Sequence, residues 1–373
     1  ITFATACAKT DNAFDLKTIG VTTATIALND ASFDDFLKDI QPQVVLFDRF
    51  MIEEQFGWRV SEHCPNALKI LDTEDLHCLR KGRQQAFKDN KAFSDNYLYS
   101  DLASREIASI LRCDITLMIS EFEMAFLQSK FNIKESQLFY IPFLIEDNQI
   151  LNQNELTAFE NRHHFITIGN FFHEPNWQSV LLLKQTIWPK IRQQLPDAQL
   201  HIYGAYVSQK ATQLHQPKDG FYIEGFAEDV NAVMQNAKIC LAYLPFGAGL
   251  KGKILDAIQN GTPCAMNSVA SEAMFGDFSI NGICEDEIDH FVEKTVELYK
   301  NKSKWENAQT NGFYALKERF SKELFNNTFL NRVEAVAKDL NSHRQQHFMG
   351  QILQHHTLQS SKYLSKWIEA KNK

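Results

Sequence analysis

The chain alternates short apolar runs with segments in which apolar residues recur every three or four positions. This alternation is typical of parallel strands that are joined by crossover helices. In the first half we expect strands at residues 1–6, 23–29, 43–48, 67–75, 115–120 and 138–142. Helical spacing lies between them, near residues 32–40, 51–63, 76–88, 100–111 and 121–131. We therefore predict one doubly wound α/β domain in this half.

One of these helices carries a start signal. Ser120 is followed three residues later by Glu123, which matches a capping box. In that motif the serine hydroxyl accepts a hydrogen bond from the backbone N–H of the glutamate, and the glutamate carboxylate accepts one from the backbone N–H of the serine. We expect the helix to begin directly after Ser120.

After residue 142 a polar segment interrupts the pattern, and a second αβ series follows it. Its strands are expected at 164–170, 199–204, 221–226 and 239–244, with helices at 176–195 and 230–237. Residues 288–340 have helical spacing. The last piece ends in an amphipathic helix that holds Tyr363, Leu364, Trp367 and Ile368. We expect this helix to dock on the chain's own domains, and a partner or membrane surface is the alternative.

These patterns divide the chain into four parts. We predict an N-terminal Rossmann-like domain at 1–145, a linker at 146–162, a second Rossmann-like domain at 163–335 and a helical tail at 336–373. Because the sequence opens inside an apparent strand, a further strand and helix are expected before Ile1. Ligands are expected in the crevice between the two domains, at the carboxyl ends of the strands.

Composition narrows the class of protein. With 373 residues, 44% of them hydrophobic and 23% charged, the chain fits a soluble two-domain protein. No apolar run approaches the ~20 residues that span a bilayer. The seven cysteines form no C-x-x-C pair, which indicates a reducing, cytoplasmic compartment and no metal site. The net charge of -8 argues against a nucleic-acid partner, although residues 301–373 carry 12 Lys and Arg against 6 Asp and Glu.

The strongest chemical signal is a glycine loop between the strand at 239–244 and the next helix. Gly247, Gly249 and Gly252 let backbone amides approach a ligand, and the first amides of the helix are unpaired. Lys251 and Lys253 add two ammonium groups, so the loop favours a phosphate. The residues expected to bind this anion are Pro245, Gly247, Ala248, Gly249, Leu250, Lys251 and Lys253, and Asp256 is expected to take ribose hydroxyls.

Three interpretations of this loop compete. The glycines spell the dinucleotide fingerprint G-x-G-x-x-G, with Glu272 placed 20 residues past Gly252. Gly247, Gly252 and Lys253 also match most of a P-loop, but Ile254 stands where that motif has a serine or threonine whose hydroxyl binds magnesium. The third interpretation is a loop for the diphosphate of a sugar nucleotide, and it depends on the rest of the chain.

Other strand ends of the second half repeat the same residue types. Gly169 and Asn170 close one predicted strand, Tyr203 and Gly204 the next, and Phe226 follows a third. Together with the glycine loop these ends would form a shelf for a flat ligand, with Phe226 or Tyr203 under a base. Tight turns between strand and helix are the alternative explanation of the glycines.

Polar residues also follow the strands of the first half. Asp75 and His77 come after the strand at 67–75, and Asp48 and Glu53 come after the preceding strand. An imidazole there could hydrogen-bond a transferred sugar or an acceptor hydroxyl, and the carboxylates could line the acceptor side. A structural histidine and a solvated rim are the alternatives.

At this point the order of the motifs resembles a known family. Segments ITIGNFFHEPNWQSV, IWPKIRQQLPDAQLHIYG, IEGFAEDV and CLAYLPFGAGLKGKILDAIQNGTPCAMNSVASEAM resemble the donor domain of family 4 (group 1) retaining glycosyltransferases of the GT-B fold. Segments DTEDLHCLR and ISEFEMAFLQSKF resemble their acceptor domain. The resemblance implies that a sugar moves from a nucleotide donor with retained configuration, without a metal or a cofactor.

The resemblance also assigns roles to individual residues. The donor motif of the family has two glutamates separated by seven residues; Asp256 holds the second place, which meets the ribose. Ala248 holds the first, so that carboxylate is absent, as in a sub-group with GAG-x-K-x-K in this loop. His77 matches the family's histidine after a first-domain strand. Lys253 is expected to stabilise the leaving diphosphate, so His77 and Lys253 are the predicted catalytic residues.

Several functional alternatives stay open. The implied partners are a nucleotide-sugar donor and a glycan, lipid-linked or protein acceptor, as in polysaccharide biosynthesis. Contact with the inner face of a membrane or an assembly complex through the tail is a further expectation. Ala248 motivates a catalytically inactive GT-B subunit that binds or scaffolds, and Gly247 to Gly252 motivate an NAD-dependent oxidoreductase.

Overall fold

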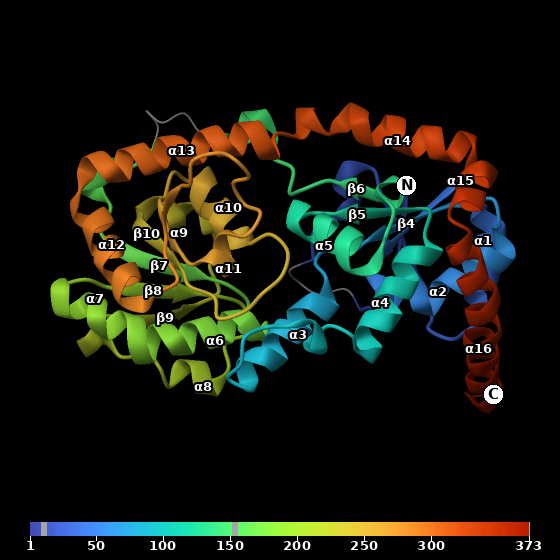
Figure 1. The fold of residues 1–373 in the computed structure, drawn as a ribbon, viewed down its shortest axis with the longest axis horizontal. Helices are drawn as coiled ribbons and strands as arrows, with labels where there is room; N and C mark the ends of the chain where they lie inside the picture. The colour runs from blue at the N-terminus through green and yellow to red at the C-terminus, as the bar shows by residue number, and fades with distance from the viewer. Residues whose placement is uncertain (9–12, 151–155, 373) are drawn as a thin grey trace.

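The computed structural model contains two α/β domains that lie side by side, with long helices along one edge of both (Figure 1). It describes residues 1–8, 13–150 and 156–372. Each domain is built on a parallel sheet with helices packed against it. The predicted fold class is confirmed.

The sheet of the first domain has four parallel strands in the order β3-β4-β5-β6. Their bounds are Val44–Asp48, Leu68–Asp72, Ile115–Met118 and Leu138–Tyr140. Helices α1 (Ser32–Ile40), α2 (Phe50–His63), α3 (His77–Lys88), α4 (Asp101–Arg112) and α5 (Glu121–Phe131) complete this part. The two central strands are almost entirely buried, as expected for a parallel sheet that is covered on both faces.

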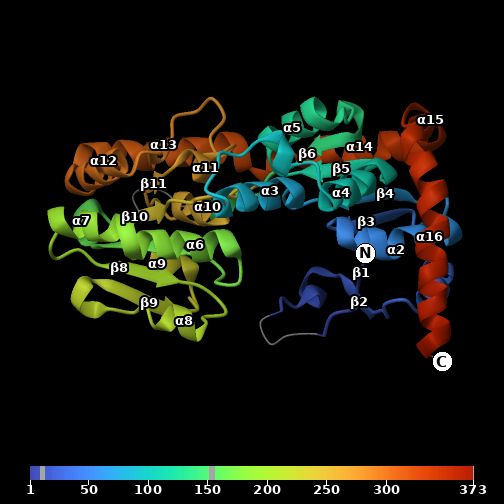
Figure 2. The same ribbon diagram turned by 60° about the horizontal axis from the view of Figure 1, so that its bottom comes forward.

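The first two strands do not join this sheet, although we expected all the strands of this half in one doubly wound domain. β1 (Thr2–Thr5) and β2 (Thr22–Thr25) pair only with each other among the described residues, and Figure 2 shows them apart from β3. Val44 and Leu46 of β3 are correspondingly exposed. Periodicity locates a strand, but it does not determine which edges pair.

The second domain has six parallel strands in the order β12-β11-β10-β7-β8-β9. Strands β7 (His164–Ile168), β8 (Leu200–Tyr203), β9 (Phe221–Gly225) and β10 (Ala237–Ala242) match the prediction, whereas the short β11 (Cys264–Met266) and β12 (Gly282–Cys284) were missed. Its shorter helices are α8 (Gln209–Thr212), α9 (Val230–Asn236), α10 (Gly252–Gln259) and α11 (Ser268–Ser271). The strand order reverses between β7 and β10, which is where such sheets bind ligands.

The helix predicted at 176–195 is present from residue 174 to 194, with a different hydrogen-bond pattern in its middle. It consists of α6 (Glu174–Leu182), a π-helical segment (Leu183–Ile187) and α7 (Trp188–Gln194). Pro189 has no N–H to donate to the preceding turn, so the regular hydrogen-bond ladder is interrupted there. In the predicted linker, residues 146–150 and 156–162 contain only short 3-10 turns, and residues 151–155 lie outside the described part.

The helices from residue 288 onward tie the domains together. α12 (Ile288–Lys300) and α13 (Lys302–Phe320) cover the second domain. α14 (Asn326–Lys338) and α15 (Leu340–Gln346) follow, and Figure 1 shows them returning over the first domain. Val336 of α14 is buried with Leu68 and Ile70. The boundary predicted at residue 335 therefore lies inside a helix that packs on the first domain.

The final helix, α16 (Phe348–Asn372), docks on α2 and α4 as predicted. Arg59 donates a hydrogen bond to the Ser365 hydroxyl, and Gln354 donates to the carbonyl of Arg112. Side chains on its outer face, including Trp367, are exposed. Membrane or assembly contact through this face stays a prediction. Among the described helices, none has the length and apolar character needed to cross a bilayer.

Candidate functional site

A cavity of about 720 Å³ lies between the carboxyl edges of the two sheets. The second domain contributes the residues after β7 and β10, which is the reversal point of its strand order. The first domain contributes the residues after β3 and β4. The residues that line the cavity from both domains and belong to the predicted site are Asp48, Asp75, His77, Gly169, Gly247, Ala248, Leu250, Lys251, Lys253 and Asp256.

The floor of the cavity is the loop between β10 and α10. Lys251 is the N-cap of α10, and no side chain caps that helix end. The backbone amides of the first turn are therefore not satisfied by a side-chain cap, and they lie at the positive end of the helix. Gly252 and Lys253 of this turn line the cavity. The arrangement favours an anion, as the sequence predicted.

The three loop glycines have different structural roles. A Cβ on Gly249 would lie 2.8 Å from the Cβ of Asp75, and its φ is +62°. A Cβ on Gly252 would meet nothing within 4 Å, and one on Gly247 would make only ordinary contacts. Gly249 does not line the cavity. Its lack of a side chain is thus required by contact between the domains.

Burial changes the protonation chemistry of the two polar residues on α10. The pKa of Lys253 falls to about 8, mainly because the ammonium is desolvated. Desolvation also raises the pKa of Asp256 to about 6, and the nearby Lys253 opposes that rise. At neutral pH both groups are mostly charged, and both face the cavity.

On the opposite wall, His77 begins α3. Its Nε2 lies 3.4 Å from Oδ1 of Asp75, whose Oδ2 accepts a 2.5 Å hydrogen bond from Arg80. The ring of Phe50 contacts His77 edge to face. Burial, together with the charge of Arg80, lowers the pKa of His77. The imidazole is therefore biased toward its neutral form, which can accept or donate a proton.

The other carboxylates of this wall lie at the same strand end as Asp75 and His77, and sequence reasoning gave them no individual role. Asp72 and Glu74 line the cavity, and burial raises the pKa of each. Glu74 has a φ of +62°, a conformation that is uncommon for residues other than glycine. His173, at the start of α6, lines the opposite side. The carboxyl end of β4 is the signal for Asp72 and Glu74, whereas His173 comes five residues after β7.

Several predicted ligand residues lie outside the cavity. Those that do not line it are Asn170, Tyr203, Gly204, Phe226, Pro245 and Gly249. Asn170 instead accepts a hydrogen bond from the backbone of Phe172, and Phe226 is exposed. Phe226 follows β9, at the edge of the sheet, whereas Tyr203 ends β8 and packs against the hydrophobic cluster that contains Ile166 and Leu244.

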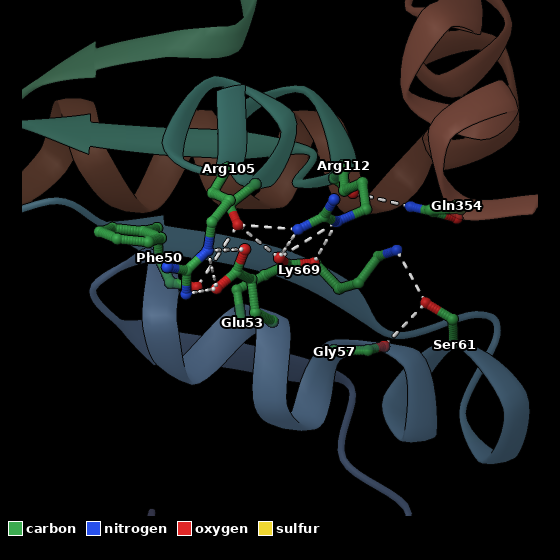
Figure 3. A network of polar contacts seen from close by, with 10 residues as sticks. Phe50, Glu53, Gly57, Ser61, Lys69, Arg105, Arg112 and Gln354 are labelled. Atoms are coloured by element: carbon green, nitrogen blue, oxygen red, sulfur yellow. Dashed lines mark hydrogen bonds and ion pairs between the residues drawn. The ribbon is translucent and has the colours of Figure 1, made fainter. Parts of the chain in front are cut away.

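Glu53 is the clearest correction. Its carboxylate is buried inside the first domain, where it forms an ion pair with Arg112 and accepts a 2.7 Å hydrogen bond from Ser109 (Figure 3). Glu53 lies one turn into α2, and its helical position turns it toward α4 and away from the crevice. Among the described residues, no cluster of three or more His, Cys, Asp and Glu side chains could hold a metal ion.

Comparison with known proteins agrees with this architecture. The family model described as "Glycosyl transferases group 1" matches residues 162–301. No curated protein matches the sequence.

Solved structures show the same fold at low sequence identity. S. aureus TarM, crystallised as a mutant with Fondaparinux, alpha-GlcNAc-glycerol and UDP, has a TM-score of 0.62 at 13% identity over 80% of this chain and 57% of its own. Pneumococcal O-GlcNAc transferase GtfA, in complex with UDP and GlcNAc, has a TM-score of 0.59 at 14% sequence identity. The match covers 82% of this chain and 59% of GtfA.

Anabaena Alr3699/HepE in complex with UDP and glucose has a TM-score of 0.59 at 11% identity, over 88% of both chains. The chain spans less than two thirds of TarM and GtfA. Identities this low establish the fold alone. The family model matches residues 162–301, within the second domain, and the solved structures show that the chain has the GT-B fold.

Proposed function

We propose that this chain is a glycosyltransferase that moves a sugar from a nucleotide-sugar donor to a glycan, lipid-linked or protein acceptor. The observation that carries the proposal is the cavity at the strand-order reversal, where the start of α10 and two lysines face the opposite domain. Three structural neighbours were crystallised with UDP. UDP is therefore the first nucleotide to test.

The chemistry follows from where charge develops. As the glycosidic bond breaks, the bonding electrons go to the diphosphate oxygen, whose negative charge increases. The amides of α10 and the ammonium groups of Lys251 and Lys253 would stabilise that charge more in the transition state than in the ground state. Asp256, one turn further, would accept hydrogen bonds from the ribose.

The opposite wall suits the sugar and the acceptor. Asp75 holds His77 in reach of the cavity, and Asp48 lies at the rim with Arg49. His77 would hydrogen-bond the transferred sugar or the acceptor hydroxyl. On the basis of the family resemblance, we also propose that the transfer retains the configuration of the sugar and needs no metal ion.

The proposal is tested by replacing Lys253. We expect Lys253→Ala to reduce kcat by at least ~10-fold, because loss of one charge contact of ~1.4 kcal/mol in the transition state costs a decade in rate. The rate of UDP-sugar hydrolysis or transfer measures this effect. Lys210→Ala, on an exposed lysine of α8, is the matched control. Unchanged kinetics in Lys253→Ala would discard the assignment.

A catalytically inactive GT-B subunit is the second candidate. Ala248 favours it, because this cavity residue offers no carboxylate to a donor sugar. UDP binding with no turnover of any sugar nucleotide would support that alternative, and detectable donor hydrolysis would exclude it.

Two residues that an NAD-binding loop would use are occupied by other contacts within the protein. Glu272, the acidic residue of the dinucleotide fingerprint, forms two hydrogen bonds with Arg83 and does not line the cavity. The amide of Gly249, the middle glycine, donates to Glu123. Tight binding of NADH without affinity for nucleoside diphosphates would still restore this alternative.

A further inference from the structure

We propose that Arg83 and Glu123 of the first domain are positioning residues that clamp the glycine loop of the second domain in its ligand-binding conformation. The inference rests on the proposed function, because this loop is the part assigned to the donor diphosphate. Neither residue lines the cavity. Any effect on ligand binding must therefore pass through the loop.

Arg83 holds one end of the loop. Its Nη1 donates to the carbonyl of Gly247 at 2.8 Å, and the same guanidinium makes two hydrogen bonds to Glu272 at 2.9 and 2.8 Å. Side chains of Arg83 and Glu272 are both only 15% exposed. A two-bond contact between arginine and carboxylate fixes the plane of the guanidinium. The Gly247 carbonyl thus has a fixed partner from the other domain.

Glu123 holds the other end. Its Oε1 accepts hydrogen bonds from the amides of Gly249 at 2.7 Å and of Leu76 at 3.3 Å. Ser120 does cap α5, but the Glu123 side chain does not complete the predicted capping box. It reaches across the domain interface instead. Because Gly249 has no Cβ, the loop can approach Asp75 closely enough for this contact.

The clamp continues to a cavity residue. Nζ of Lys251 donates to the Gly249 carbonyl at 2.5 Å, so fixing Gly249 also fixes the ammonium of Lys251. Burial lowers the pKa of Lys251, whereas Glu272 and Glu123 act in the opposite direction. Glu272, the carboxylate that Arg83 contacts, therefore favours the charged form of a lysine that lines the cavity.

A second interdomain arginine provides a matched control. Arg319 of α13 pairs with Glu121 and donates to the Ala273 carbonyl. Like Arg83 it is mostly buried and joins the two domains. Its contacts do not include residues 247–253. Loss of Arg319 removes an interdomain ion pair without releasing the loop.

The test is calorimetric titration of the full chain with UDP, or with GDP or ADP if UDP does not bind. We expect Arg83→Gln to weaken the Kd about 10- to 100-fold, because small displacements of binding groups cost factors of that size. Arg319→Gln should change it by no more than about twofold. Thermal unfolding of each variant reports whether it is folded.

Glu123 is tested by a pair of variants. Glu123→Ala should weaken binding as Arg83→Gln does. Glu123→Gln keeps an acceptor for the Gly249 amide, so we expect it to bind within about threefold of the wild type. Burial raises the pKa of Glu123 to about 8. The side chain is thus largely protonated at pH 7, and glutamine resembles that form.

Two results would overturn the clamp: equal weakening by Arg83→Gln and Arg319→Gln, or equal weakening by Glu123→Ala and Glu123→Gln. Wild-type binding with no change in any variant would also reject it while leaving the proposed function intact. A wild-type chain that binds none of the three nucleoside diphosphates would instead reject the proposed function.

Discussion

Two charged residues on one helix turn give the site its expected response to pH. In the proposed function Lys253 acts on the diphosphate in its protonated form, and Asp256 acts on the ribose hydroxyls in its ionised form. Burial moves the pKa of Lys253 down to about 8 and that of Asp256 up to about 6. The two shifts narrow the range in which both groups are charged.

We therefore expect a bell-shaped pH profile of kcat/KM, with limbs near the pKa values of about 6 and about 8. Activity falls below the lower value as Asp256 gains a proton, and above the upper value as Lys253 loses one. Rates measured between pH 5 and 10 check this. In Lys253→Arg the alkaline limb should disappear, because guanidinium does not deprotonate there. An unchanged alkaline limb in that variant would assign it to another group.

The buried pair of Glu53 and Arg112 makes a second prediction at this scale. Arg112→Met leaves the Glu53 carboxylate buried without its cation, so we expect it to lower the free energy of unfolding by ~3–5 kcal/mol. Denaturant titration measures the change. Arg105→Met breaks the more exposed pair with Glu54 and should cost at most ~1 kcal/mol. Equal losses would mean that burial of the Glu53 pair does not decide its contribution.

Among the elements, α16 is held by close backbone contact with the first domain. A Cβ on Gly350 would lie 2.1 Å from the carbonyl oxygen of Leu111. Only glycine permits this approach, so the position of the helix depends on one residue as well as on the Arg59–Ser365 and Gln354–Arg112 contacts.

Gly350→Leu should displace the helix and destabilise the protein by ~1–3 kcal/mol, the usual range for overpacking. Met349→Ala, on an exposed neighbour in the same helix, should stay within ~0.5 kcal/mol. Thermal unfolding of both variants gives the comparison. If Gly350→Leu melts like the wild type, the helix has another way to dock.

At the scale of the whole molecule, the cavity exists only where the two domains meet. Arg83–Glu272 and Arg319–Glu121 cross the interface, and α14 brings the chain back from the second domain to the first. A bound ligand would contact both domains, so it should stabilise them together.

We expect UDP at ~100 times its Kd to stabilise the fold by ~2.7 kcal/mol. For a chain of 373 residues this corresponds to a rise in Tm of roughly 3 °C in a single transition. Calorimetry with and without UDP measures the rise, and NADH serves as the control. Two transitions, only one of which shifts, would show that the ligand does not join the domains.

The sequence by itself determined most of the elements and pointed to an anion at the glycine loop. Helical and alternating periodicities placed most strands and helices, because side-chain burial repeats with the geometry of each element. The glycines and lysines between residues 247 and 253 indicated an anion site, since helix starts and ammonium groups attract anions wherever they lie. Asp75 and His77 were identified because residues after parallel strands share one edge of the sheet.

Only the tertiary structure decided which residues face one another. Periodicity did not separate β1 and β2 from the main sheet, because pairing depends on contacts that are distant in the sequence. Glu53 and Asp48 are both carboxylates at or shortly after the strand at 43–48, so the sequence did not distinguish them. In the structure Glu53 lies on α2, and the helix directs its side chain into the core. Gly249 and Glu123 each fitted a local motif, and both are used for contact between the domains. Local sequence specifies local conformation, whereas the partner of a side chain is fixed only when distant segments pack.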